Sequence, residues 1–178
     1  MRRVARRYAK ALLKIGQEDG NLERYGEELA LFNNYMQAEE KLREALVNPT
    51  IHSSQREAVI RELAPRLGLS EVMVRFLVLL VERNRMDVLP EIVEVYREFL
   101  DDAMGRVRGV LYVPFELPEE KLQEIVKGLE EKVGKKVILR VELDPSIIGG
   151  AVAKIGGVVY DGSVKAQLRR LRENLAKG

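Results

Sequence analysis

The sequence contains no cysteine and a single histidine, His52, in 178 residues. Without cysteine the chain can form no disulfide bond, thiolate nucleophile or cysteine-ligated metal site. One histidine is too few for the metal sites that several imidazoles build together. These absences exclude the commonest forms of thiol chemistry and of transition-metal binding.

Long apolar runs are also missing. A membrane-spanning helix needs roughly 20 consecutive apolar residues. The longest run here, VMVRFLVLLV over residues 72–81, has 10 residues and contains Arg75. Glu71 and Glu82 stand on either side of it. The run therefore predicts a helix in the core of a bundle, and we expect no direct insertion into a membrane.

Charge of one sign does not dominate the chain. There are 30 basic and 28 acidic residues, a net charge of +2, which disfavours a dedicated nucleic-acid-binding protein. The hydrophobic content of 46% is enough for packed cores. Residues 1–105 carry 16 basic and 18 acidic side chains, whereas residues 106–178 carry 14 and 10. The second part is therefore the more positive one.

Apolar residues recur at helical spacing through the first part of the chain. The pattern predicts six helices, near residues 4–15, 22–36, 39–48, 54–67, 72–82 and 89–100. Ser54 and Glu57 have the spacing of a capping box, and Pro65 and Gly68 are expected to close that fourth helix. No strand-like alternation occurs before Gly105, so residues 1–105 are predicted to form a six-helix bundle.

The period changes after residue 105. Alternating apolar residues predict strands at 106–113 and 136–143, separated by a helix that begins near Pro118. Gly156-Gly157 predicts a hairpin between residues 151–155 and 158–161. Ser163 is placed to cap a last helix, whose apolar side would hold Val164, Leu168, Leu171 and Leu175. The fold class is therefore α+β overall: a six-helix bundle (1–105) followed by a small α/β domain (106–178) with a short sheet and two helices on one side of it.

Motifs that could carry chemistry are weak. GLEEKVGKK over residues 128–136 is similar to a phosphate-binding loop, but it has five residues instead of four between its glycines and lacks the final hydroxyl residue. It also follows a predicted helix and precedes a strand, the reverse of the required order, so Gly134 is expected to end that helix. The paired carboxylates at helix ends have no nucleophile near them in sequence. We expect no catalytic site, no cofactor and no metal.

Three stretches carry a resemblance to a known family. ARRYAKALL (5–13) is similar to its first helix, and FLVLLVERNRMDVLPEIVEVYREFLDDAMG (76–105) to its fifth and sixth. The most specific stretch lies near the C-terminus and contains Gly149, Gly150, Asp161, Gly162, Ser163, Gln167 and Leu168. On these residues and on the order of elements, the chain resembles the delta subunit of the F-type ATP synthase, the bacterial counterpart of the mitochondrial oligomycin-sensitivity-conferring protein. Arg7 departs from the pattern, because the family often has proline there.

The resemblance implies a non-catalytic stator subunit that links the catalytic head to the peripheral stalk, so that proton-driven rotation is coupled to ATP synthesis. It implies a peripheral position at the cytoplasmic face of the cell membrane. The bundle would bind the N-terminal segments of alpha subunits in a groove between its first and fifth helices. The groove residues would be Ala5, Tyr8, Ala9, Leu12 and Leu13 on one wall and Val74, Leu77, Val78 and Val81 on the other. The alternative is that these residues belong simply to the core of the bundle, as some of them must.

The resemblance assigns the second domain to the b-type subunits of the stalk. The residues carried over for that contact are Gly149, Gly150, Asp161, Ser163, Gln167, Leu168 and Arg169.

The residues alone leave two other interpretations open. A basic N-terminus could make the chain a nucleic-acid-binding adaptor, whose affinity would fall steeply with salt; its residues would be Arg2, Arg3, Arg6, Arg7, Lys10 and Lys14. A nucleotide-binding enzyme would use GLEEKVGKK or the glycine hairpin.

Overall fold

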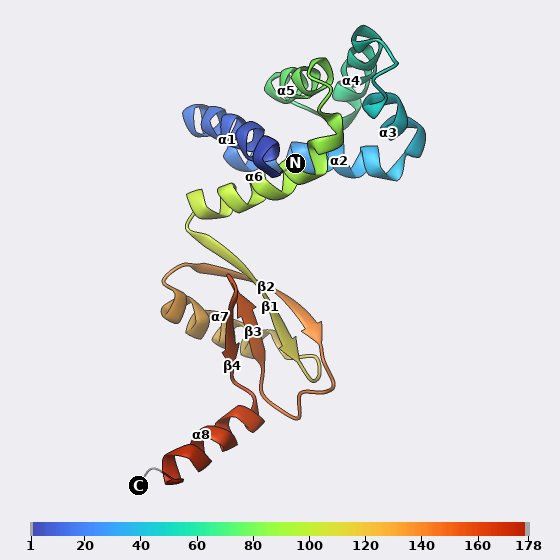
Figure 1. The fold of residues 1–178 in the computed structure, drawn as a ribbon. Coiled ribbons are helices and arrows are strands. Elements are labelled where there is room, and N and C mark those ends of the chain that lie inside the picture. Colours follow the sequence, from blue (N-terminus) through green and yellow to red (C-terminus); the bar gives the residue numbers. More distant parts are fainter. Residues whose placement is uncertain (1, 177–178) are drawn as a thin grey trace. The chain divides into compact units, whose positions relative to one another are not determined.

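The computed structural model describes residues 2–176. The chain divides into two compact units, residues Met1–Leu100 and Asp101–Gly178. The first unit is helical and the second contains a sheet (Figure 1). The α+β class and the order of its parts are confirmed.

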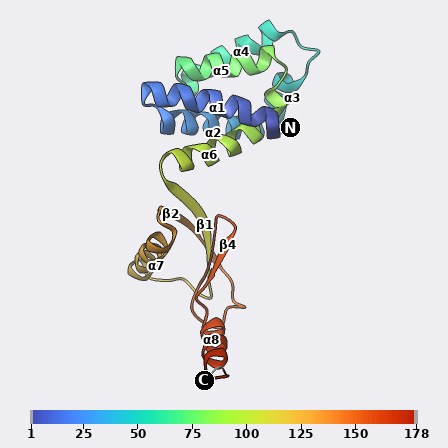
Figure 2. The ribbon, with the colours of Figure 1, turned by 60° about the vertical axis from the view of Figure 1, so that its left-hand side comes forward.

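Six α-helices and a short 3-10 helix make up the chain as far as the start of the sheet (Figure 2). They are α1 (Arg2–Asp19), α2 (Leu22–Ala38), α3 (Glu40–Val47), α4 (Ser53–Leu67), α5 (Glu71–Glu82), η1 (Met86–Val88) and α6 (Leu89–Ala103). All six predicted helices are present, and apolar residues recur with the helical period in them.

Helix α4 begins differently from the prediction. Its N-cap is His52, whose side chain makes no capping hydrogen bond. Ser54 is therefore already inside the first turn, where its hydroxyl cannot act as the cap. Glu57 instead accepts hydrogen bonds from Arg61, at 2.9 Å from Nε and 2.7 Å from Nη2. The capping-box prediction is wrong, whereas the predicted end is confirmed, since Gly68 is the C-cap with φ 64°.

Helix α5 is the centre of the helical core. Seven of its twelve residues are buried, and Leu77, Leu80 and Val81 have no exposed area. Each such side chain stabilises the fold by about 1.5–3 kcal/mol relative to an exposed position. Only a narrow outer strip, which includes Glu71, Arg75 and Glu82, remains exposed. The near-continuous apolar run in the sequence is thus explained by burial on most sides of this helix.

A buried carboxylate joins α2 to the start of α5. Glu28 is 7% exposed. Its Oε2 accepts hydrogen bonds from the backbone N–H of Ser70 at 2.9 Å and from the Ser70 hydroxyl at 2.6 Å. Its Oε1 accepts from Nε of Arg24 at 2.7 Å. Ser70 is itself the N-cap of α5, accepting from the N–H of Met73, so Glu28 fixes the helix start and the helix packing together.

The turn between α1 and α2 is held by a second polar contact. Asp19 accepts a hydrogen bond from the hydroxyl of Tyr25 and another, at 3.0 Å, from the N–H of Asn21. The tyrosine hydrogen bond lowers the pKa of Asp19, and the same bond raises the pKa of Tyr25. The ionised carboxylate therefore stabilises the turn.

The second unit contains one four-stranded sheet, in the order β2-β1-β3-β4. Its elements are β1 (Arg106–Val113), α7 (Glu119–Val133), β2 (Lys136–Leu143), β3 (Val152–Ile155), β4 (Val158–Asp161) and α8 (Val164–Ala176). Strands β1 and β2 are parallel and joined through α7, whereas β1–β3 and β3–β4 are antiparallel. The predicted hairpin is confirmed, with its turn at Gly156 and Gly157, both at positive φ.

The two helices of this unit differ in their packing. Helix α7 packs on the sheet, with Leu129 buried against Leu111, Val113 and Val137. Helix α8 buries Ala166, which is 2% exposed, in its first turn, while Val164 and Leu168 are 44% and 61% exposed. In Figures 1 and 2, α8 runs away from the sheet. The expectation that both helices cover one side of the sheet is therefore wrong for α8, whose described apolar residues Val164 and Leu168 are exposed.

Candidate partner-binding surfaces

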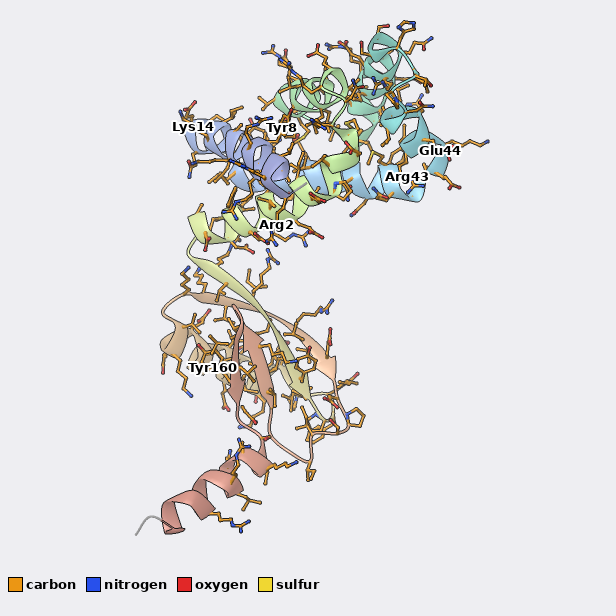
Figure 3. All side chains as sticks on the ribbon, in the orientation of Figure 1. Arg2, Tyr8, Lys14, Arg43, Glu44 and Tyr160 are labelled. Atoms are coloured by element: carbon orange, nitrogen blue, oxygen red, sulfur yellow. The ribbon has the colours of Figure 1, made fainter. Side chains whose placement is uncertain are left out.

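Helix α1 presents four distinct sides. The core side consists of Ala5, Ala9, Leu12 and Gly16, all buried. One flank meets α6, where Arg2 donates to Glu98 at 2.9 Å and Arg6 lies 5.3 Å from the ring of Phe99. The opposite flank meets α5, because Tyr8, which is labelled in Figure 3, packs edge-on against Phe76 with ring centroids 6.3 Å apart. The fourth side faces outward.

The helical repeat extends each flank to further residues. Positions three, four or seven residues apart lie on one side of a helix. Val4, Ala11 and Ile15 therefore share the side of Tyr8, and Val72 and Leu79 share the side of Phe76. Ile15 is 41% exposed and Leu79 is 38% exposed. We call these seven residues the α1–α5 surface: Val4, Tyr8, Ala11, Ile15, Val72, Phe76 and Leu79.

The glycines near the C-terminus shape the junction between the hairpin and α8. Gly150 has φ 83°, and a Cβ there would overlap the carbonyl oxygen of Gly162 and lie 2.9 Å from the Cα of Ser163. Gly162 donates its N–H to the carbonyl of Ala151 at 2.9 Å. The N–H of Val164 donates to the carbonyl of Gly149 at 3.0 Å. Two backbone segments thus approach too closely for any side chain at position 150.

The polar residues of the same stretch complete the start of α8. Asp161 accepts from the N–H of Ser163 at 3.0 Å, and the Ser163 hydroxyl accepts from the N–H of Ala166 at 3.2 Å. Gln167 donates from Nε2 to the carbonyl of Gly162 at 3.3 Å. Ser163 is the predicted helix cap, and that prediction is confirmed. These residues orient the helix, and Leu168 and Arg169 follow them on its exposed part.

An open cavity of ≈ 690 Å³ adjoins this junction. Its apolar lining comes from the sheet and from α7, and includes Leu111, Ala153, Ile125 and Leu129. Its rim includes Lys121 and Lys132 from α7, and Gly150, Asp161 and Gln167 from the junction. Tyr160, labelled in Figure 3, also lines it. An apolar cavity with a mixed rim suits a peptide or helix rather than a reacting small molecule, because no nucleophile with a base lies in it.

Sites for other chemistry are not found within residues 2–176. No group of three or more His, Asp or Glu side chains there could hold a metal ion. None of the described helices is long and apolar enough to cross a membrane. GLEEKVGKK is the end of α7 and the start of β2, and Gly134 is the C-cap with φ 70°. That motif therefore has the helix-end role that its order in the sequence predicted.

Comparison with known proteins decides the family. The model of the family described as "ATP synthase delta (OSCP) subunit" matches residues 4–175. The chain belongs to this family. The delta subunit of Geotalea uraniireducens is 43% identical over 175 residues, which cover 98% of this chain and 97% of that protein. The delta subunit of Trichlorobacter lovleyi is 41% identical over 175 residues, with the same coverage.

A solved structure agrees in fold. A chain of the Toxoplasma gondii mitochondrial ATP synthase hexamer matches with a TM-score of 0.63 over 97% of each chain, at 24% sequence identity. The resemblance stated from sequence is thus confirmed. As a delta/OSCP subunit, the chain is a non-catalytic stator component of the F-type ATP synthase.

The structure separates the candidate groove residues of this delta subunit into distinct groups. Ala5, Ala9, Leu12, Leu77 and Val81 have no exposed area and belong to the core. Leu13 lies on the α6 flank of α1, since it is seven residues from Arg6. Val74 and Val78 are 9% and 8% exposed. Each is two residues from Phe76, about 200° around the helix, so both lie on the flank of α5 away from α1.

Tyr8 alone of the nine lies on the side where α1 meets α5 and keeps some exposed area. The residues of the α1–α5 surface that sequence reasoning missed are Val4, Ala11, Ile15, Val72, Phe76 and Leu79. Ile15 and Leu79 could have been found as apolar positions outside the core stripe of each helix. The sequence does not indicate which flank of α5 faces α1, because this depends on the packing of the whole bundle.

The C-terminal residues of this delta subunit are brought together more completely. Gly149, Gly150, Asp161, Ser163 and Gln167 meet at one junction, through the contacts described above. Leu168 and Arg169 lie beside them on α8. The side chains of Leu171 and Leu175, which were predicted on the same side of α8 as Leu168, lie outside the described residues.

Proposed function

We propose that this stator subunit joins two parts of the ATP synthase through two separate surfaces. The helical unit binds the N-terminal helix of an alpha subunit on the α1–α5 surface. The second unit binds b-type subunits of the peripheral stalk through α8 and the adjoining cavity. The complex places the chain at the cytoplasmic face of the membrane, as a peripheral subunit. Holding both parts prevents the catalytic head from turning with the central shaft.

The exposed apolar flanks of α1 and α5 carry the first half of this proposal. Ile15 and Leu79 are 41% and 38% exposed on helices whose other apolar residues are mostly buried. An amphipathic partner helix laid along two such stripes would bury its own apolar positions three and four residues apart. The stripes flank the Tyr8–Phe76 contact, which gives the surface a rigid aromatic centre.

The exposed side of α8 supports the second half. Val164 and Leu168 are four residues apart on the side opposite the buried Ala166. The capped junction holds that apolar side outward, next to the cavity. Two contacts on one chain reinforce each other through effective concentration, so neither contact has to be very tight alone.

The alternative of a nucleic-acid-binding adaptor is disfavoured by the contacts of α1. Two of its six basic candidates, Arg2 and Arg6, are engaged on the surface by Glu98 and Phe99 of α6. Lys14 lies 4.0 Å from Glu18. The net charge of only +2 also disfavours a dedicated nucleic-acid-binding protein.

A titration of the full chain with two synthetic peptides tests the proposal. One peptide is the N-terminal segment of the alpha subunit from the same genome, and the other is the C-terminal segment of its b subunit. Leu79→Asp is expected to weaken the alpha peptide at least tenfold by placing a charge in an apolar contact, and Leu168→Asp to do the same for the b peptide. Each variant serves as the control for the other peptide.

Leu31→Asp is a matched control on α2, where Leu31 is 46% exposed. It makes the same chemical change away from the α1–α5 surface and is expected to leave both affinities unchanged. If both peptides fail to bind a folded chain, or if Leu31→Asp weakens the alpha peptide as much as Leu79→Asp does, the assignment of these surfaces is wrong.

A further inference from the structure

A line of four cations runs along the outward side of α1, next to the α1–α5 surface. The residues are Arg3, Arg7, Lys10 and Lys14, and all four are exposed. Their spacing of four, three and four residues keeps them within about 60° of one another around the helix. The line is about 16 Å long at 1.5 Å per residue. It is therefore parallel to the apolar stripe of Val4, Tyr8, Ala11 and Ile15.

Most of this charge is not neutralised within the bundle. Within residues 2–176, Arg3, Arg7 and Lys10 have no carboxylate at ion-pair distance. Lys14 lies 4.0 Å from Glu18, and both side chains are more than two-thirds exposed. The guanidinium of Arg7 lies 5.7 Å from the ring of Tyr8, so it leans toward the apolar stripe. The line is thus a positive rim along one edge of the α1–α5 surface.

The other edge of the surface differs. On α5 the exposed strip contains Glu71 and Arg75, which pair with each other, and Glu82. These charges sum to a weakly negative edge. A helix lying between the two edges would therefore meet strong positive potential on its α1 side only.

From this asymmetry we infer that the partner of the α1–α5 surface is an acidic amphipathic helix, with carboxylates along the side that meets Arg3, Arg7, Lys10 and Lys14. The inference rests on the proposed function, since it concerns the same surface, and it adds the chemistry and the orientation of the partner. Complementary rim charges steer association and fix the register of a docked helix, while the apolar stripe supplies most of the affinity. The partner would have Asp or Glu at positions three and four residues apart, beside its apolar anchors.

Nucleic acid is the other class of molecule that a positive rim attracts. A single-strand binder combines such charge with aromatic rings on which bases stack. The aromatic residue beside this line, Tyr8, is already engaged by Phe76 and by Arg7. The adjoining apolar stripe has no role in phosphate binding but suits a helix. The observations therefore favour a protein helix.

The test compares two variants of the full chain that lose the same charge. Arg7→Gln with Lys10→Gln removes half of the rim, and Lys41→Gln with Lys127→Gln removes two exposed lysines from α3 and α7. Each protein is titrated with the alpha N-terminal peptide at 20 mM and at 500 mM salt. A second peptide, in which every Asp and Glu is replaced by Asn and Gln, is titrated in parallel.

The rim variant is expected to bind the natural peptide about three- to tenfold more weakly at low salt, as two exposed charge pairs would give. At high salt the difference in affinity between the rim variant and wild type should fall below about twofold. The reason is that salt screens the attraction between the rim and the peptide in wild type as well. The neutral peptide should bind both rim variant and wild type alike. The variant with Lys41 and Lys127 replaced should bind both peptides as tightly as wild type does at both salt concentrations.

The proposed function and the acidic partner can be refuted separately. If wild type does not bind the natural peptide at either salt concentration, the proposed function fails, and this inference with it. If wild type binds, and Leu79→Asp abolishes binding while the rim variant matches wild type at low salt, the surface stands and the acidic partner is refuted. If a single-stranded oligonucleotide binds wild type more tightly than the peptide does, and the rim variant loses that binding, nucleic acid replaces the acidic helix.

Discussion

Replacing Gly150 by alanine tests whether the backbone structure of the junction requires glycine at this position. Alanine at φ 83° takes on a left-handed backbone that costs about 1–2 kcal/mol. Its Cβ would also overlap the carbonyl oxygen of Gly162, which is backbone and cannot swing away. Relieving such an overlap costs about 1–3 kcal/mol more. We therefore expect Gly150→Ala to destabilise the junction by about 2–5 kcal/mol.

Gly157 provides the control for this prediction. It has the same φ of 83°, but a Cβ there would have no atom within 4 Å. Gly157→Ala should therefore cost only the backbone part, about 1–2 kcal/mol. The difference in destabilisation between the two variants is the free-energy cost of the overlap between the new Cβ and the neighbouring backbone.

Native-state hydrogen exchange of the β3 and β4 amides gives the local free energy of opening in each variant. This probe reports on the second unit alone, whatever the helical unit does. The b peptide should also bind Gly150→Ala more weakly, because the junction orients α8. If the two variants have the same opening free energy within about 0.5 kcal/mol, the close approach of the two backbone segments is not the reason that position 150 requires glycine.

Two further predictions concern the helical unit. Glu28→Ala should lower its unfolding free energy in urea by about 3 kcal/mol, because the part-buried N–H and hydroxyl of Ser70 lose their charged acceptor. The exposed neighbour variant Glu27→Ala should change it by less than about 0.5 kcal/mol, and equal effects would contradict this role. The hydrogen bond from Tyr25 holds the pKa of Asp19 below its ordinary value of 3.8, so its stabilisation is complete above that value and is lost as the pH falls through the lowered pKa. Between pH 5 and pH 2 the urea midpoint should fall more steeply for wild type than for Asp19→Asn, and parallel profiles would refute the assignment.

The elements were predictable because local patterns are strong. The six helices, the α7 crossover and the glycine hairpin all follow from apolar periods and turn residues, which depend on neighbours in sequence. The start of α4 was missed because Ser54 and Glu57 have the spacing of a capping box, whereas the observed cap, His52, makes no side-chain capping bond that a sequence pattern could reveal. At α8 the residue with a capping side chain, Ser163, is also the observed cap.

The candidate surface was less predictable than the fold. Periodicity identifies the apolar positions of α5, yet it does not say whether Phe76 or Val78 faces α1, because both are apolar and nearly opposite on the helix. That choice depends on how the helices pack in the whole bundle. The exposed side of α8 was missed for a similar reason: an apolar stripe looks alike in sequence whether it covers its own sheet or meets another chain.

The order of the strands has a mechanical consequence. The chain leaves α6 and enters the sheet at Arg106, the first residue of the central strand β1. Tyr112 near the other end of β1 is paired with Val152, and Val152 with Asp161, from which the chain leaves toward α8. Entry and exit are thus at opposite ends of the sheet, about 20 Å apart along the strand direction. A force that pulls α6 and α8 apart therefore acts along the strands. The hydrogen bonds of the β1–β3 and β3–β4 ladders are then loaded together in shear and do not open one after another.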